Sequence, residues 1–278
     1  MVELMRLSVR GLDINYEKSG NGQPLVLVHG GGLDLISWED MVPLFDRLFT
    51  VFRFDMRGFG ETKRLDQTPL SMDAWALDLA AFIETLDISR PSIVGWSLGG
   101  AVACEFASRF PDSPRTIALI GAPGPFMTAP DRSGFDRREA MIRDGHTADE
   151  VIDATFDFTK AAFSPYSIDN NPRSLERIRA GLKRNFNVNY AEMVDALRSR
   201  DMSPDKLRRI RCPALVIVGE HDSRTPPSMS EDLNKFIPHS YMKLLENCGH
   251  YYGYEHPREC VRVVTEFLRA DWANVGRS

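Results

Sequence analysis

Residues 92–109, SIVGWSLGGAVACEFASR, join a short apolar run to a glycine-rich turn and a longer apolar segment. The run at 92–94 predicts a buried strand, and apolar residues at helical spacing predict a helix over 98–109. Between them Ser97 sits in a G-x-S-x-G motif, Gly95 to Gly99. A strand, a sharp turn and a helix form the setting in which such a serine projects above a sheet as a nucleophile. This setting favours a reactive serine over the alternative, a glycine-rich turn that buries it.

The same alternation of strands and helices extends along the chain on both sides of this stretch. Further strands are predicted at 25–28, 51–54, 116–120, 214–218 and 241–245, and further helices at 38–48, 72–86 and 258–272. Such alternation is typical of crossover units around a parallel sheet. Residues 5–9 and 14–17 lie on either side of Gly11 and predict an antiparallel hairpin at the start. We therefore expect an α/β fold with a mostly parallel central sheet flanked by helices.

Residues 123–200 interrupt this rhythm with charge-rich helical pieces and no convincing strand. The segment follows a predicted strand, so it emerges at the edge of the sheet where Ser97 should lie. We expect a helical cap at 123–200, inserted in a core formed by 1–122 and 201–278; the alternative is a peripheral decoration. Arg137, Arg138 and His146 fall in this segment, and a solvated helix face is favoured over substrate contact for them.

Composition excludes several classes of function. The chain has 278 residues, 43% of them hydrophobic, and 34 basic against 39 acidic residues leave a net charge of −5. A nucleic-acid-binding protein would normally show a basic excess, and no apolar run reaches the roughly 20 residues that span a bilayer. The opening residues lack the layout of a signal peptide, so the cytoplasm is the expected compartment. We expect a small-molecule substrate, no nucleic acid and no membrane as partners, and a homodimer remains open.

Neither a disulfide framework nor a metal site is indicated. The four cysteines are scattered, and the chain contains no CxxC and no HExxH motif. No metal or organic cofactor is therefore expected. Cys248, two residues before His250, is a rival nucleophile that the context of Ser97 disfavours.

A serine nucleophile needs a base and a carboxylate that orients the base. Among six histidines, His250 follows the last predicted strand, where its loop can overhang the serine, whereas His29 suits a structural loop. Asp222 follows the penultimate strand and lies further into the loop than Glu220. The order Ser97, Asp222, His250 is one of the three known chain orders of such a triad.

These motifs resemble those of α/β-hydrolase-fold serine hydrolases along nearly the whole chain. The matching pieces are His29-Gly30-Gly31-Gly32, Trp38, Asp55-Met56-Arg57-Gly58-Phe59-Gly60, Gly95-Trp96-Ser97-Leu98-Gly99-Gly100, Gly219-Glu220-His221-Asp222 and Gly249-His250. The resemblance implies that Ser97 is the nucleophile, His250 the base and Asp222 its orienter. It also implies an oxyanion hole formed by the backbone N–H groups of Gly31 and Leu98. Asp55 and Arg57 are expected to hold a loop instead of touching substrate.

At several positions this chain differs from particular subfamilies of the fold, and these differences reduce the number of candidate reactions. Epoxide hydrolases and haloalkane dehalogenases of this fold have aspartate in place of Ser97. Proline iminopeptidases typically have proline at Gly32 and tryptophan at Leu98. Carbon–carbon bond hydrolases share the His-Gly-Gly-Gly start but usually have asparagine at Trp96 and tryptophan at Tyr251. The resemblance therefore favours a carboxylic ester or lactone as substrate.

Two alternatives stay open beside this esterase or lactonase hypothesis. One is hydrolytic carbon–carbon cleavage of a diketone by the same triad, and the other is a hydrolase-derived ligand receptor that signals through its cap. The apolar side chains expected to wall the pocket are Trp38, Trp96, Phe126, Phe163 and Tyr251.

Overall fold

The structure is a computed structural model that describes residues 3–125, 132–186 and 189–272. Within these residues nine strands form one sheet in the order β1-β2-β4-β3-β6-β7-β8-β9, with β5 beside β2. The strands are β1 Glu3–Val9, β2 Leu12–Gly20, β3 Gln23–Val28, β4 Phe49–Phe54, β5 Lys63–Arg64, β6 Ser92–Trp96, β7 Thr116–Ile120, β8 Ala214–Gly219 and β9 Ser240–Leu245. The first two form the predicted antiparallel hairpin, and β3, β4 and β6 to β9 run parallel. The predicted fold class is confirmed.

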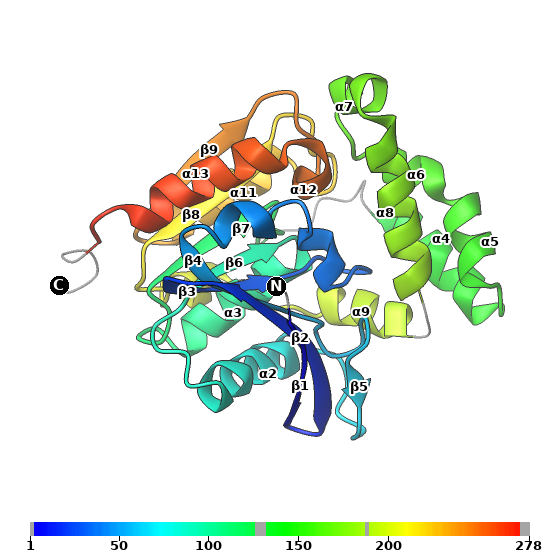
Figure 1. Ribbon diagram of the computed structural model, residues 1–278. Helices are drawn as coiled ribbons and strands as arrows, with labels where there is room; N and C mark the ends of the chain where they lie inside the picture. The colour runs from blue at the N-terminus through cyan, green and yellow to red at the C-terminus, as the bar shows by residue number, and fades with distance from the viewer. Residues whose placement is uncertain (1–2, 126–131, 187–188, 273–278) are drawn as a thin grey trace.

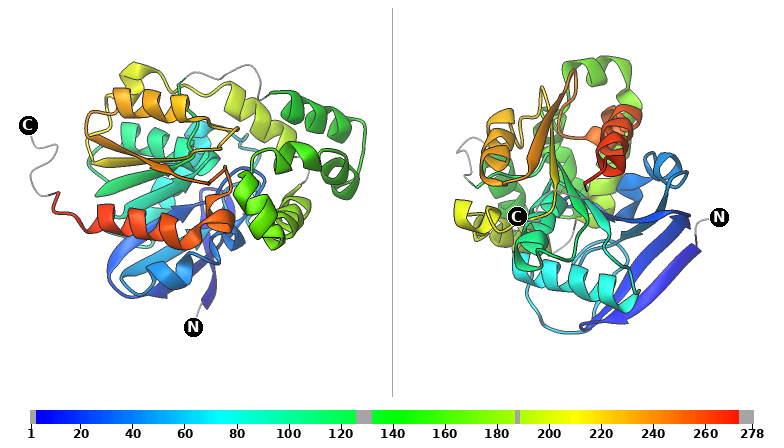
Figure 2. Two further views of the ribbon diagram at one scale, coloured as in Figure 1. Left: turned by 90° about the horizontal axis from the view of Figure 1, so that it is seen from above. Right: turned by 90° about the vertical axis from the view of Figure 1, so that its left-hand side faces the viewer.

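Helices cover both faces of this sheet (Figures 1 and 2). One group contains α2 Met72–Thr85, α3 Leu98–Arg109, α10 Pro204–Leu207 and α11 Pro227–Phe236. The other contains η1 Leu35–Trp38, α1 Val42–Phe45, α12 Tyr252–Glu255 and α13 Pro257–Arg269. The strands β3, β6, β7 and β8 are apolar and buried along nearly their whole length, as expected of a parallel sheet between two helical layers.

The helix predicted over 38–48 is the main error in these elements. A 3₁₀ turn, η1, is separated there from the single turn α1. Pro43 lies in the first turn of α1, where its missing N–H costs nothing, but the same residue cannot continue a helix from upstream. The apolar spacing was therefore correct for burial and wrong for helix length.

Six helices fill the described part of the segment between β7 and β8 that was expected to be helical. They are α4 Arg132–Arg143, α5 Ala148–Ala154, α6 Phe156–Lys160, α7 Pro165–Asn170, α8 Pro172–Asn185 and α9 Asn189–Arg198. Figure 1 shows α4 to α8 in green, gathered to one side of the sheet core. This group, with α9, is called the helical insertion below.

Sheet topology determines where a site can form. Strand β3 lies between β4 and β6 in the sheet. The chain therefore adds β4 on one side of β3 and β6 on the other. In the β3–β6 pair, Val28 lies opposite Gly95. Loops that leave the carboxyl ends of two such strands diverge and leave a crevice between them. Here those loops carry His29 to Gly32 and Ser97.

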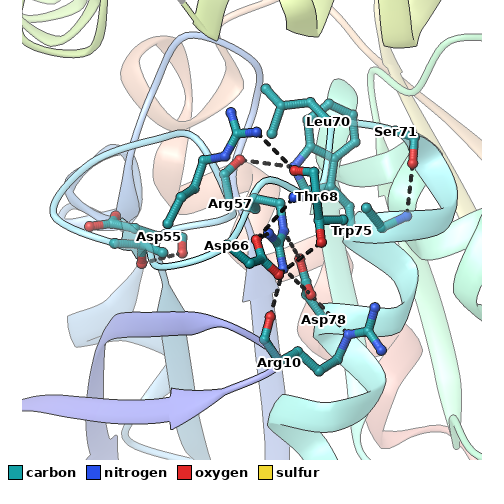
Figure 3. Close-up of polar contacts among 12 residues, drawn as sticks. Arg10, Asp55, Arg57, Asp66, Thr68, Leu70, Ser71, Trp75 and Asp78 are labelled. Carbon is teal, nitrogen blue, oxygen red and sulfur yellow. Dashed lines mark hydrogen bonds and ion pairs between the residues drawn. The ribbon is translucent and has the colours of Figure 1, made fainter.

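The loop after β4 is held by buried ion pairs, as expected for Asp55 and Arg57. Figure 3 shows Arg57 between Asp66 and Asp78, to which it donates at 2.6 and 2.7 Å. Asp55 accepts from the backbone N–H groups of Leu35 and Glu61, both at 2.8 Å. Neither residue is among those that line the cavity described below. Both side chains therefore serve the scaffold.

Asp34 joins the helical insertion to the core. Its carboxylate accepts from Asn185 Nδ2 at 2.7 Å and Arg184 Nε at 2.9 Å on α8, and caps η1 through the N–H of Ile36. Burial alone would raise the pKa of Asp34, but the hydrogen bonds from Arg184 and Asn185 and the Arg184 charge lower it overall. The ionised form therefore stabilises the attachment of α8.

We expect Asp34→Asn to lower the free energy of unfolding at pH 7 by about 1 kcal/mol. The depressed pKa means that this stabilisation is present above the unfolded pKa, near 4, and is lost as pH falls through the lower folded pKa. Denaturant unfolding of both proteins at pH 7 and pH 3 measures it. The difference between the two proteins should be smaller at pH 3 than at pH 7, and an equal difference at both pH values contradicts the role of the charge.

Candidate active site

Ser97 stands on a strained turn between β6 and α3. Its backbone has φ 52° and ψ −116°, in a region that residues with side chains rarely adopt. The turn needs glycine on both sides, because a Cβ on Gly95 would lie 2.2 Å from Gly99 O and one on Gly99 would lie 2.1 Å from Val28 O. The N–H of Ser97 donates to Ile120 O on β7 at 2.9 Å. The motif therefore folds as the tight strand-to-helix turn that its glycines indicate.

Ser97, His250 and Asp222 form one chain of hydrogen bonds. The Oγ of Ser97 lies 3.1 Å from His250 Nε2, and His250 Nδ1 lies 2.9 Å from Asp222 Oδ2. A carboxylate only accepts, so the hydrogen-bond network assigns the imidazole proton to Nδ1. Nε2 is then free to accept the hydroxyl proton of Ser97. This is the geometry in which histidine acts as a general base.

Asp222 is buried and accepts several further hydrogen bonds. Its Oδ1 accepts from the N–H groups of Arg224 and Thr225, both at 2.9 Å, and its Oδ2 from Tyr252 Oη at 2.7 Å. Burial alone would raise the pKa of Asp222, but the charge of His250 and these hydrogen bonds hold it below its ordinary value. Asp222 therefore stays an anion beside His250.

A second buried carboxylate, Glu255, fixes the loop that carries His250. It accepts from the N–H groups of Gly249 and Tyr251, on either side of the histidine, both at 3.0 Å. It also accepts from the N–H of Ser164 in the helical insertion at 2.9 Å. One side chain thus connects the histidine loop to the helical insertion, a role that no sequence motif indicated.

The backbone N–H groups of Gly31 and Leu98 are available beside Ser97. Both residues line the same cavity as Ser97 and His250, and neither N–H donates to a described group. Leu98 is the first residue of α3, where the helix leaves its N–H groups without internal acceptors. A Cβ on Gly31 would lie 2.8 Å from Met193 Sδ, so glycine allows the close packing of α9 there. Two N–H groups beside a nucleophile can stabilise a developing oxyanion.

A cavity of about 130 Å³ opens above Ser97 between the core and the helical insertion. A single water needs roughly 10–15 Å³ on this measure, so the space takes a small organic molecule. Its walls are mostly apolar and include Leu182, Tyr190 and Met193 of the helical insertion. Apolar walls bind a ligand by removing its surface from water.

Only part of the expected wall lies at this cavity. Trp96 and Tyr251 line it. Trp38 does not, because it packs edge-to-face behind Trp96 and is 1% exposed. Phe163 does not either, because it is buried and stacks on Tyr251 with ring centroids 4.5 Å apart. The prediction that Trp38 and Phe163 line the pocket is therefore wrong: both lie behind residues that line the cavity. Phe126 lies outside the described residues.

Part of the cavity wall is charged, which no sequence motif indicated. Arg138 lines the cavity and is 4% exposed, although a solvated helix face was favoured for it. One signal was available, since Arg138 shares the apolar stripe of α4 with Phe135, Met141 and Ile142 at helical spacing. An arginine on such a stripe faces the interior.

The rival candidates do not suit catalysis. Cys248 is fully buried, and burial raises the pKa of its thiol far above the ordinary value, which disfavours the thiolate. His29 accepts from the N–H of Met56 at Nε2, which assigns its proton to Nδ1, 2.8 Å from Gly30 O. It anchors a loop, as expected.

Among the described residues no three His, Cys, Asp or Glu side chains gather where they could hold a metal ion. No helix in the described part of the chain is long and apolar enough to cross a bilayer.

Comparison with known proteins identifies the class. The family model for the alpha/beta hydrolase fold matches residues 23–257, so the chain belongs to this family of hydrolases. It is 30% identical over 272 residues to 2-hydroxy-6-oxo-2,4-heptadienoate hydrolase of Pseudomonas putida, covering 94% of each chain. It is 26% identical to 3-oxoadipate enol-lactonase 2 of Acinetobacter baylyi, covering 91% of each. A thermophilic esterase from Thermogutta terrifontis superposes with a TM-score of 0.81 and 26% identity, over 97% of this chain and 98% of that one.

Proposed function

We propose that this hydrolase cleaves a small to medium carboxylic ester or lactone through an acyl-enzyme. The observation that carries the proposal is the hydrogen-bonded chain of Ser97, His250 and Asp222, which opens onto an apolar cavity beside two available N–H groups. A lactonase and an esterase among the similar proteins support the same chemistry.

Each proposed step follows from this geometry. Ser97 Oγ attacks the carbonyl carbon while its proton passes to His250 Nε2. The N–H groups of Gly31 and Leu98 stabilise the oxyanion. The intermediate expels the alcohol oxygen, which takes the proton from His250, and leaves an acyl group on Ser97. Water then attacks, gives a proton to His250 and releases the acid, and the proton returns to Ser97.

We propose that residues 123–200 act as the cap of this site and that 1–122 and 201–278 form its core. Leu182, Tyr190 and Met193 supply cavity wall from the helical insertion. Such a roof excludes water from the acyl-enzyme until the product leaves, and its movement would gate entry.

Carbon–carbon hydrolysis is the second candidate. The Pseudomonas putida relative acts on a 2-hydroxy-6-oxo-dienoate, a compound without an ester bond, so its hydrolysis breaks a carbon–carbon bond. Against this candidate, Trp96 and Tyr251 flank the serine and the histidine, where such enzymes usually have asparagine and tryptophan. The indole N–H of Trp96 is already bonded to His250 O at 3.0 Å.

A substrate panel decides between the two candidates. We expect kcat/KM for the best activated ester or lactone to exceed that for 2-hydroxy-6-oxo-2,4-heptadienoate by about a hundredfold or more, since a site matched to one leaving group discriminates at that level. Steady-state kinetics on straight-chain esters, five- and six-membered lactones and the dienoate measure it. Faster turnover of the dienoate would reverse the assignment.

A further inference from the structure

Several arginines lie in the wall of the cavity above Ser97. Its described lining contains four arginines and one acidic residue: Arg138, Arg198, Arg200, Arg224 and Asp136. Arg198 is already paired, because it contacts the carboxylates of Asp136, Glu139 and Asp195. Arginine is therefore the main charged residue type in a wall that is otherwise mostly apolar.

Arg138 is the most buried of these charges, with 4% of its surface exposed. Its Nε donates to Thr155 Oγ1 at 2.8 Å and its Nη2 to Thr159 Oγ1 at 2.6 Å. Both are neutral groups, and no carboxylate of residues 3–125, 132–186 or 189–272 lies within 4 Å of the guanidinium. A buried charge without a counter-charge is costly, so this guanidinium favours an anion in the cavity.

Tyr190 on α9 adds a hydroxyl to the same wall. The side chain is buried, lines the cavity, and its O–H has no acceptor among the described groups. Arg138 lines the same cavity as Tyr190. Burial raises the pKa of Tyr190, and the charge of Arg138, an interaction of its guanidinium with the hydroxyl and the charge of Arg224 oppose that rise. A neutral O–H without an acceptor, beside a guanidinium, is arranged to bind an anionic oxygen.

We propose that Arg138 and Tyr190 form a carboxylate-binding subsite, so that the substrate carries a free carboxylate in addition to the bond that is cleaved. The nature of that bond rests on the proposed function; the subsite does not. A guanidinium presents paired N–H groups that match the two oxygens of a carboxylate, and the phenol supplies a further donor. The subsite would select substrates by charge as well as by shape.

The test compares 4-nitrophenyl half-esters of dicarboxylic acids, from succinic to suberic, with 4-nitrophenyl esters of monocarboxylic acids of the same chain length. We expect the wild type to prefer a half-ester at one or more chain lengths by about tenfold or more in kcat/KM, and Arg138→Met to lose the preference. Arg137→Met is the matched control, because the neighbouring Arg137 is exposed and carries the same charge. It should keep the preference.

Tyr190→Phe separates recognition from folding. The O–H of Tyr190 has no acceptor among the described groups, so its removal should change the thermal midpoint little while it reduces the preference several-fold. If Arg138→Met fails to fold, Arg138→Lys and Tyr190→Phe carry the test. A preference that survives in these variants overturns the subsite.

A readout without hydrolysis distinguishes the two proposals. The free dicarboxylates should raise the Tm of the wild type and Arg137→Met but not that of Arg138→Met. If no ester is cleaved and the Tm shift still depends on Arg138, the proposed function fails and the subsite stands. If neutral esters are cleaved while neither the preference nor the Tm shift depends on Arg138, the subsite is wrong and the proposed function stands.

Discussion

Replacing Ser97 with alanine should lower kcat/KM for an activated ester by about four to six orders of magnitude. The hydroxyl is the one group that would form the acyl-enzyme, and its described hydrogen bond is the 3.1 Å contact with His250 Nε2. The turn itself should survive, because alanine keeps the Cβ that serine already holds at φ 52°. Steady-state kinetics of the purified variant measure the loss, and thermal unfolding checks the fold.

The matched control for this variant is Cys248→Ser. Cys248 is buried, and its Sγ faces Gly249 O at 3.6 Å. A serine at this position should leave activity within a few-fold of wild type. Activity of Ser97→Ala above a tenth of wild type, or a large loss in Cys248→Ser, would show that the nucleophile has been misassigned.

Asp222→Asn should lower kcat by about three to four orders of magnitude, because His250 would adopt the wrong tautomer for a general base. The N–H groups of Arg224 and Thr225 both donate to Oδ1, so the amide oxygen of an asparagine would take that place. Its NH₂ group would then face His250 Nδ1. The imidazole proton would move to Nε2, and that nitrogen could no longer accept a proton from Ser97.

Glu220→Gln provides the control for this charge removal. Glu220 is exposed, two residues before Asp222, and undergoes the same acid-to-amide change. It should keep nearly full activity. Equal losses in the two variants would assign the effect to general charge removal or to folding, and would remove Asp222 from the proposed triad.

The order of the elements could be read from local sequence because the signals are local. Buried parallel strands such as β6 and β8 are short apolar runs, and α2 repeats apolar residues at helical spacing. Where a local signal was ambiguous the prediction failed, as at Pro43, which begins a new turn and cannot continue the previous one.

The residues of the candidate site could likewise be predicted where their sequence signals are local. Ser97 could be found from its neighbours because a tight turn between a strand and a helix requires glycines at particular offsets. His250 and Asp222 were placed by their positions after the last two strands of the sheet, since the carboxyl ends of parallel strands meet at one edge. The structure brings all three side chains into one hydrogen-bonded chain.

The cavity wall required the tertiary structure. Whether a side chain faces a cavity depends on how segments distant in sequence pack, and the apolar character of a residue does not report it. Trp38 is as apolar as Trp96 but lies behind it, whereas Arg138 is charged and lies in the wall. Phe135 of α4 meets Arg224, in the loop after β8, only in the folded chain. Local sequence therefore determined the sheet and the turn that carries Ser97, and packing decided which charges surround the candidate site.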